Sequence, residues 1–360
     1  MDTNFIEWAK ANQDKALIQN GLLEPRYAHD GVGAAVVVRG ALYFERAFDP
    51  DVRKALVDCF DDYCATPGCK LTFLWNNGKA AQAFGKAKPF RSIAASLGPE
   101  DRFDFCYVGG EAATDASLWR FEVTGLRQWQ EAKGTRGLNA LAFSVPLPAV
   151  QENPDAFAKL FFDFARRINA AHGQAGFAVN LSPTNPEENE ATEHWISQIM
   201  PGLDVGRPDS VSARGLRDRV KSVNWLTAIG KPMLDAVGGV AALRSELPPS
   251  WFSVGDYGAG VVIRAGVQPE SGVSDSEDKP PVPPPAYVVL DHALRAVRAS
   301  EMEILQRGTV NAGAPVYNTP ASTAAWLRRF ETDDSGLLAA KAALLDTPQL
   351  SVANALPNPL

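Results

Sequence analysis

The stretch from residue 220 to 266 constrains this chain more than any other part of it. It places an apolar run at 223–229 and a helical pattern over 233–246. A second apolar run at 251–254 comes before a glycine-rich turn at 255–260. This order predicts a strand, a helix and a β-hairpin. The stretch holds no nucleophile paired with a base, no metal-ligand spacing and no phosphate-binding loop, so we expect the protein to act by binding.

Two other parts of the chain repeat the order of strand, helix and strand. Asp49 and Asn153 each stand directly before a proline, as at a capped helix start. The first helix is expected to end at Pro67, and the second near residue 171. The expected flanking strands are 36–44 and 71–75 for the first helix, and 138–147 and 177–181 for the second. With further strands near 103–108 and 118–123, the pattern predicts an α+β fold of mixed sheets with helices packed on them, built from repeated strand–helix–strand units.

The length of the chain bounds its domain organisation. With 360 residues, 46% of them hydrophobic, it can bury a full core. We expect a globular body over 1–310, which can divide into two halves that meet near 135–140, followed by a peripheral arm over 311–360. The segment 271–285 is polar and then rich in proline, which is typical of an extended surface loop.

The charge balance limits the classes of partner. Lys and Arg total 35 against 42 Asp and Glu, a net charge of −7. This balance argues against nucleic acid and anionic membrane as direct partners and suits a basic protein. No basic leader begins the sequence, and no run of about 18 apolar residues could span a membrane. We therefore expect a cytoplasmic protein.

Catalytic and metal-binding patterns are missing. None of the four histidines stands in a metal-ligand motif, and His172 is expected at a helix end. Cys59, Cys64 and Cys69 are too widely spaced for a structural zinc clamp. Cys59 falls on the apolar stripe of its helix, as a core thiol does. We predict no catalytic residue, no metal and no cofactor.

One acidic run is the candidate partner-binding site. It comprises Glu187, Glu188, Glu190 and Glu193, with Trp195 on the apolar side of the same predicted helix. Carboxylates in a first helical turn are stabilising in their own right, which explains the run without any partner. The alternative is that these residues present negative charge to a cationic groove on another protein, where complementary charge speeds association.

The stretch over residues 220–266 also resembles a known family, the immunity proteins that neutralise toxins of the type VI secretion system. The resemblance rests on Lys221-Ser-Val-Asn-Trp-Leu-Thr227, the Gly238-Gly239 pair and the hairpin at 258–266, and weakly on Tyr43-Phe44-Glu45 and 202–208. It covers residues 35–300. It implies a protein made beside its cognate toxin that protects the producing cell, and it implies no catalytic residue.

The prediction is therefore a non-enzymatic immunity protein that sterically blocks a toxin acting in the cytoplasm, with a nuclease as the candidate toxin. Two alternatives stay open: a hydrolase with an unrecognised carboxylate site, and a chaperone or adaptor for the secreted effector. The oligomeric state and the toxin's reaction do not follow from the sequence.

Overall fold

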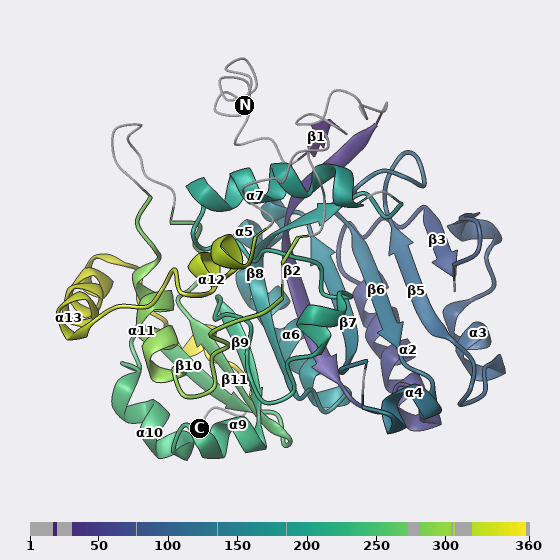
Figure 1. Ribbon diagram of the computed structural model, residues 1–360. Coiled ribbons are helices and arrows are strands. Elements are labelled where there is room, and N and C mark those ends of the chain that lie inside the picture. The colour runs from purple at the N-terminus through teal and green to yellow at the C-terminus, as the bar shows by residue number, and fades with distance from the viewer. Residues whose placement is uncertain are drawn as a thin grey trace.

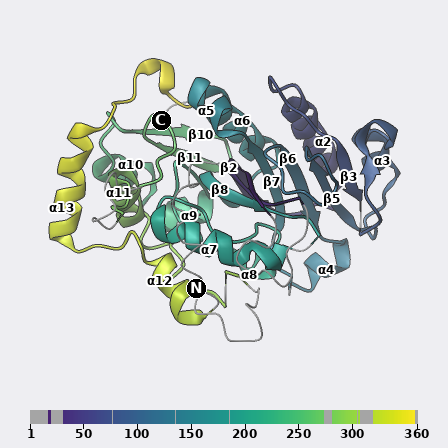
Figure 2. The same ribbon diagram turned by 90° about the horizontal axis from the view of Figure 1, so that it is seen from above.

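A computed structural model of the protein describes residues 17–19, 31–76, 78–134, 136–184, 186–272, 281–303, 305–306 and 319–357. One large sheet crosses the molecule, with helices on both of its sides (Figure 1). Seen from above, α2, α5 and α6 lie on one side of the sheet, and α4, α7 and α8 lie on the other (Figure 2). Within the described ranges, no helix combines the length and the apolar character needed to cross a bilayer.

The sheet has eleven strands, and every strand pairing in the described part of the chain is antiparallel. Its order is β10 (Phe252–Asp256), β11 (Gly260–Ala265), β9 (Leu226–Gly230), β8 (His172–Leu181), β2 (Val32–Phe44), β7 (Asn139–Val145), β6 (Arg120–Gly125), β5 (Phe103–Val108), β3 (Phe73–Asn76) and β4 (Gln82–Ala83). The short β1 (Leu17–Gln19) pairs with β2.

The predicted α+β class is confirmed, but the strands form one antiparallel sheet rather than mixed sheets. The reason lies in the strand order. In each strand–helix–strand segment the two strands run in the same direction. They are not neighbours in the sheet, however, because at least one other strand lies between them. Strand β2 separates β7 from β8, and β11 separates β9 from β10. The idea of one repeated unit therefore stays a prediction.

The two helices expected from their caps are present. They are α2 (Pro50–Cys64) and α6 (Pro154–Arg167), and the side chains of Asp49 and Asn153 cap them. Helix α6 ends earlier than predicted, because Asn169 takes a left-handed conformation with φ 48°. His172 then lies in β8 and not at a helix end. The helix expected over 233–246 is broken in two by Gly238 and Gly239, whose φ values are 88° and 77°.

The remaining helices lie between and after the strands. They are η2 (Phe84–Lys86), α3 (Phe90–Ser96), α4 (Gln128–Ala132), α5 (Leu147–Glu152), η3 (Pro186–Asn189), α7 (Glu190–Ile199), α8 (Val211–Arg214), α9 (Lys231–Ala236), α10 (Gly239–Glu246), α11 (Pro285–Ala293), α12 (Pro320–Leu327), α13 (Asp334–Ala343), η4 (Leu344–Asp346) and η5 (Val352–Asn354).

The main core lies between the sheet and helices α2 and α6. It is strongly aromatic: Phe143 packs against Phe164 with ring centroids 4.8 Å apart, and Phe60 packs against Tyr107 at 4.5 Å. Cys59 is buried in this core, as predicted. Alternate residues of β5 and β6 enter the core, so the residues between them point to the opposite side of the sheet. That side carries the candidate site.

The C-terminal residues pack on the rest of the chain. Leu344 and Leu356 belong to the main core, whereas Trp326 and Leu327 join a second apolar cluster with Ile196 of α7. The boundaries proposed near 135–140 and at 310 stay predictions. Residues 273–280 of the proline-rich segment, and 311–318 and 358–360 of the expected arm, lie outside the described residues.

Candidate partner-binding site

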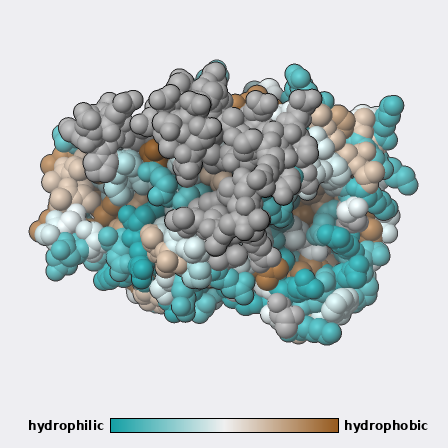
Figure 3. All heavy atoms as spheres, turned by 45° about the horizontal axis from the view of Figure 1, so that its top comes forward, coloured by the Kyte–Doolittle hydropathy of each residue, from teal (hydrophilic) through white to brown (hydrophobic). Residues whose placement is uncertain are grey.

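Two adjoining hollows lie on this side of the sheet, and we name them separately. The larger, which we call the sheet-face groove, has a volume of about 510 Å³. Its polar and aromatic lining comes from β3, β5 and β6 and from the segments around α4 and α8: Trp75, Arg102, Asp104, Phe105, Cys106, Glu122, Thr124, Arg127, Gln130, Arg136, Asp209 and Arg214. In the space-filling view, hydrophilic side chains predominate on the right-hand part of the molecule, where β3, β5 and β6 lie in Figure 1 (Figure 3).

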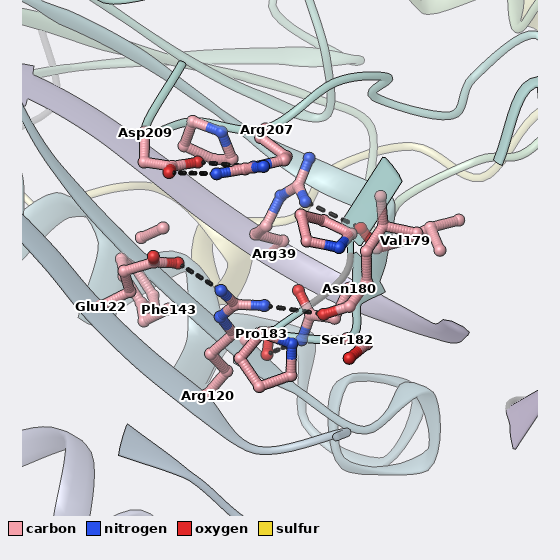
Figure 4. Close-up of a pocket in the computed structure, with 15 residues that line it drawn as sticks. Arg39, Arg120, Glu122, Phe143, Val179, Asn180, Ser182, Pro183, Arg207 and Asp209 are labelled. Atoms are coloured by element: carbon pink, nitrogen blue, oxygen red, sulfur yellow. Dashed lines mark hydrogen bonds and ion pairs between the residues drawn. The ribbon is translucent and has the colours of Figure 1, made fainter. Parts of the chain in front are cut away.

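The smaller hollow, which we call the arginine pocket, has a volume of about 110 Å³. Its charged side chains are Arg39, Arg120, Glu122, Arg207 and Asp209, and they surround one space (Figure 4). They come from β2, from β6 and from the loop between α7 and α8. Glu122 and Asp209 line both hollows, so the pocket and the groove adjoin each other.

Two ion pairs shape the arginine pocket. Arg207 donates two parallel hydrogen bonds to Asp209, from Nε to Oδ1 at 3.0 Å and from Nη2 to Oδ2 at 2.6 Å. Arg120 pairs with Glu122, with 2.9 Å between Nη2 and Oε2, and its Nη1 donates to the carbonyl oxygen of Leu181 at 3.0 Å. The Arg207–Asp209 pair has the bidentate geometry that fixes a guanidinium in one orientation. The pocket is therefore preorganised before any partner arrives.

The two carboxyl groups differ in acidity. Burial raises the pKa of Glu122, and this effect outweighs the neighbouring Arg120. Burial also acts to raise the pKa of Asp209, but its bonds to Arg207 prevail and hold that pKa below its usual value. Arg207 therefore favours the charged form of Asp209, whereas burial disfavours the charged form of Glu122.

A second ionic cluster lies next to the pocket and shares Arg39 with its lining. Asp204 lies between two cations, 3.0 Å from Nη2 of Arg39 and 2.7 Å from Nζ of Lys221. All three side chains are at most 5% exposed. Arg39 also donates to the carbonyl oxygens of Val179 and Gly206. The cluster ties β2 to the loop that carries Arg207 and Asp209.

The acidic run proposed from the sequence is divided by the fold. Glu187 is exposed and pairs with Arg207 at 3.4 Å, and Glu188 and Trp195 are half-buried. Glu190 and Glu193 are interior residues, with exposures of 3% and 1%. Glu193 accepts hydrogen bonds from the backbone of Gly206 and from Gln306, so it helps to hold the loop of the arginine pocket. Glu187 and Glu188 therefore remain the acidic candidates for a partner contact.

The residues of the arginine pocket were not singled out from the sequence. One local signal was available: Arg120 and Glu122 alternate with Phe121 and Val123, as on a strand with one polar face. Among the described residues, no group of three or more His, Cys, Asp and Glu side chains is placed to hold a metal ion.

Comparisons with known proteins identify the family of this chain. Residues 55–330 match a family model described as TsiV, type VI immunity for VRR-NUC. The chain therefore belongs to this family of type VI immunity proteins. Among solved structures it is similar to the Pseudomonas aeruginosa T6SS protein PA0821, with 35% sequence identity, a TM-score of 0.89 and full coverage of both chains. No curated protein matches it.

Proposed function

We propose that this chain neutralises a VRR-NUC nuclease toxin by binding it and covering its nucleic-acid-binding surface, with no bond made or broken. The match over residues 55–330 carries this proposal, since it names the toxin class. The net charge of −7 supports it, because a nuclease binds phosphates with a basic groove and an acidic inhibitor complements that groove.

The sheet-face groove and the arginine pocket are the proposed contact surface. Their lining mixes both signs of charge with aromatic rings such as Trp75. Arginine and tryptophan are the side chains most often found at the energetic centre of protein interfaces. Glu187 lies at the edge of this surface through its ion pair with Arg207.

The stoichiometry of protection tests the proposed mechanism. A fixed amount of the purified toxin is titrated with this protein, and nuclease activity on DNA and RNA is measured. Steric inhibition predicts that activity falls linearly and ends at one equivalent, with a 1:1 complex in size-exclusion chromatography with light scattering. Complete protection at a small fraction of one equivalent would show turnover and favour the hydrolase alternative. A complex in which the toxin stays active would favour the chaperone alternative.

Glu187 and Glu188, the two residues of the acidic run that are not fully buried, give a separate prediction. Changing Glu187 and Glu188 together to Lys is expected to slow association with the toxin about tenfold at low salt, because the electrostatic attraction is lost. The effect will shrink as salt is raised, while the dissociation rate changes little. Association rates are measured by stopped-flow fluorescence or surface plasmon resonance.

The matched control is the double variant Asp51→Lys/Glu152→Lys, which changes the net charge equally on α2 and α5. Both residues are exposed and belong to helices on the opposite side of the sheet. Equal association rates for the two double variants would mean that Glu187 and Glu188 act only through net charge.

A further inference from the structure

We propose that the arginine pocket is the anchor point of the toxin interface and that it receives the carboxylate of an aspartate or glutamate side chain of the toxin. This inference rests on the proposed function and adds to it the chemistry of one contact. It assigns an acidic toxin residue to a protein that is itself acidic, so net charge alone would not have suggested it.

Unsatisfied donors are the first argument. Arg39 is 6% exposed, and its Nε has no hydrogen-bond partner although its two Nη atoms are engaged. Nε of Arg120 is also buried without a hydrogen bond to nitrogen or oxygen, and the Cys106 thiol is a neighbour of its guanidinium. A buried donor left without an acceptor is costly, and a carboxylate offers about four lone-pair sites to neighbouring donors. An acceptor that reaches these donors would therefore be bound strongly.

The charge of the lining is the second argument. Three guanidinium groups, from Arg39, Arg120 and Arg207, face two carboxylates, from Glu122 and Asp209. Each guanidinium already has one carboxylate partner: Arg39 has Asp204, Arg120 has Glu122, and Arg207 has Asp209. A guanidinium has five N–H donors, so these arginines can bind a further carboxylate, whereas a lysine or arginine side chain offers them no acceptor. The hydrogen bonds would be charge-assisted on both sides, which makes them the stronger kind.

The size and stiffness of the pocket are the third argument. A volume of about 110 Å³ suits the end of one side chain, whereas pockets for free small molecules are usually about 300–1,000 Å³. Pro183, Pro186 and Pro208 also line the pocket, and proline restricts the backbone. A rigid pocket loses little entropy when an anchor enters.

The pocket is also reachable from the larger surface. The side chains of Arg207 and Asp209 are 34% and 23% exposed, and Asp209 lines the sheet-face groove as well. A toxin segment lying in the groove would therefore pass the mouth of the pocket. Such a central anchor surrounded by a wider contact area is the usual arrangement of an interface hot spot.

The test uses the toxin that forms the 1:1 complex described above, made catalytically inactive. Arg120→Gln and Arg207→Gln are each expected to raise the Kd at least about tenfold, mainly through faster dissociation. Arg166→Gln serves as the control, since its exposed side chain pairs with Asp163 on α6. Circular dichroism and thermal unfolding confirm that each variant is folded before its Kd is measured by calorimetry.

The occupant is identified by changing each surface Asp and Glu of the toxin to its amide. One of these variants should lose as much affinity as Arg120→Gln, and the two changes together should lose little more than either alone. Unchanged affinity for both arginine variants would overturn the inference while the proposed function stands. Additive losses with every toxin variant would equally reject a carboxylate in the pocket. If the unmodified proteins form no complex, the proposed function itself fails.

Discussion

Replacing Asp204 by asparagine is expected to lower the free energy of unfolding by about 3–5 kcal/mol, because it leaves two buried cations without their shared anion. Asp204 is 4% exposed and lies 2.7 Å from Nζ of Lys221, which is itself 1% exposed. The amide keeps the shape of the carboxyl group, so the loss reports its charge rather than its packing. Urea denaturation at pH 7 measures the change.

Two comparisons separate this effect from a general effect of losing a carboxylate. Asp235→Asn removes the partner of Lys231 in an exposed pair of similar distance, 3.1 Å, and should cost less than about 1 kcal/mol. The double variant Asp204→Asn/Lys221→Met should be more stable than Asp204→Asn alone, since it removes one of the two buried cations left without an anion. If the double variant is the less stable of the two, charge balance is not what Asp204 provides.

The same variant should change how stability depends on pH. Lys221 and Arg39 hold the pKa of Asp204 below its usual value, against the effect of burial. Its contribution to stability is therefore complete above the unfolded pKa of about 4 and is lost as pH falls through the lower folded pKa. Asp204→Asn should lose this part of the acid dependence. Burial already lowers the pKa of Lys221, so the variant should also regain stability as rising pH removes the proton from that lysine.

The elements that the sequence predicted well are those whose causes are local. Helices α2 and α6 begin where Asp49 and Asn153 precede proline, since the cap and the fixed φ of proline act within one turn. The hairpin of β10 and β11 follows from its glycine-rich turn. The sheet order was not predictable in this way, because inserting β2 between β7 and β8 depends on pairings between distant residues.

The site depends still more on distant contacts. Arg39 and Asp204 are 165 residues apart in the sequence, and they meet because the segment at Asp204 pairs with β8 beside β2. The burial of Glu190 and Glu193 in the acidic run also results from contacts between distant residues. Nothing local shows that Glu193 accepts from Gly206 and Gln306, so its burial could not be read from helical spacing. Periodicity identified an acidic helix start but not the side of the helix that the rest of the protein would cover.

Trp225→Ala should produce a loss as large as that of Asp204→Asn, about 3–5 kcal/mol, by a different mechanism. The side chain is fully buried, at 0% exposure. Its ring stacks on Phe157 with centroids 6.0 Å apart, and its indole N–H donates to the carbonyl oxygen of Gly266 at 3.1 Å. Removing it would leave a cavity between α6 and the strands β9 and β11.

Trp225→Phe tells the packing contribution apart from the hydrogen bond. Phenylalanine keeps a ring against Phe157, and the carbonyl oxygen of Gly266 still accepts from Nε of Arg264 at 3.2 Å. The loss should therefore be less than half of that for alanine. Trp129→Ala on α4, where the ring is 44% exposed, should cost under about 1 kcal/mol. Because none of these changes touches the arginine pocket, folded Trp225→Phe should still inhibit the toxin at one equivalent. Weaker inhibition by that folded variant would mean that the packing around Trp225 also shapes the toxin interface.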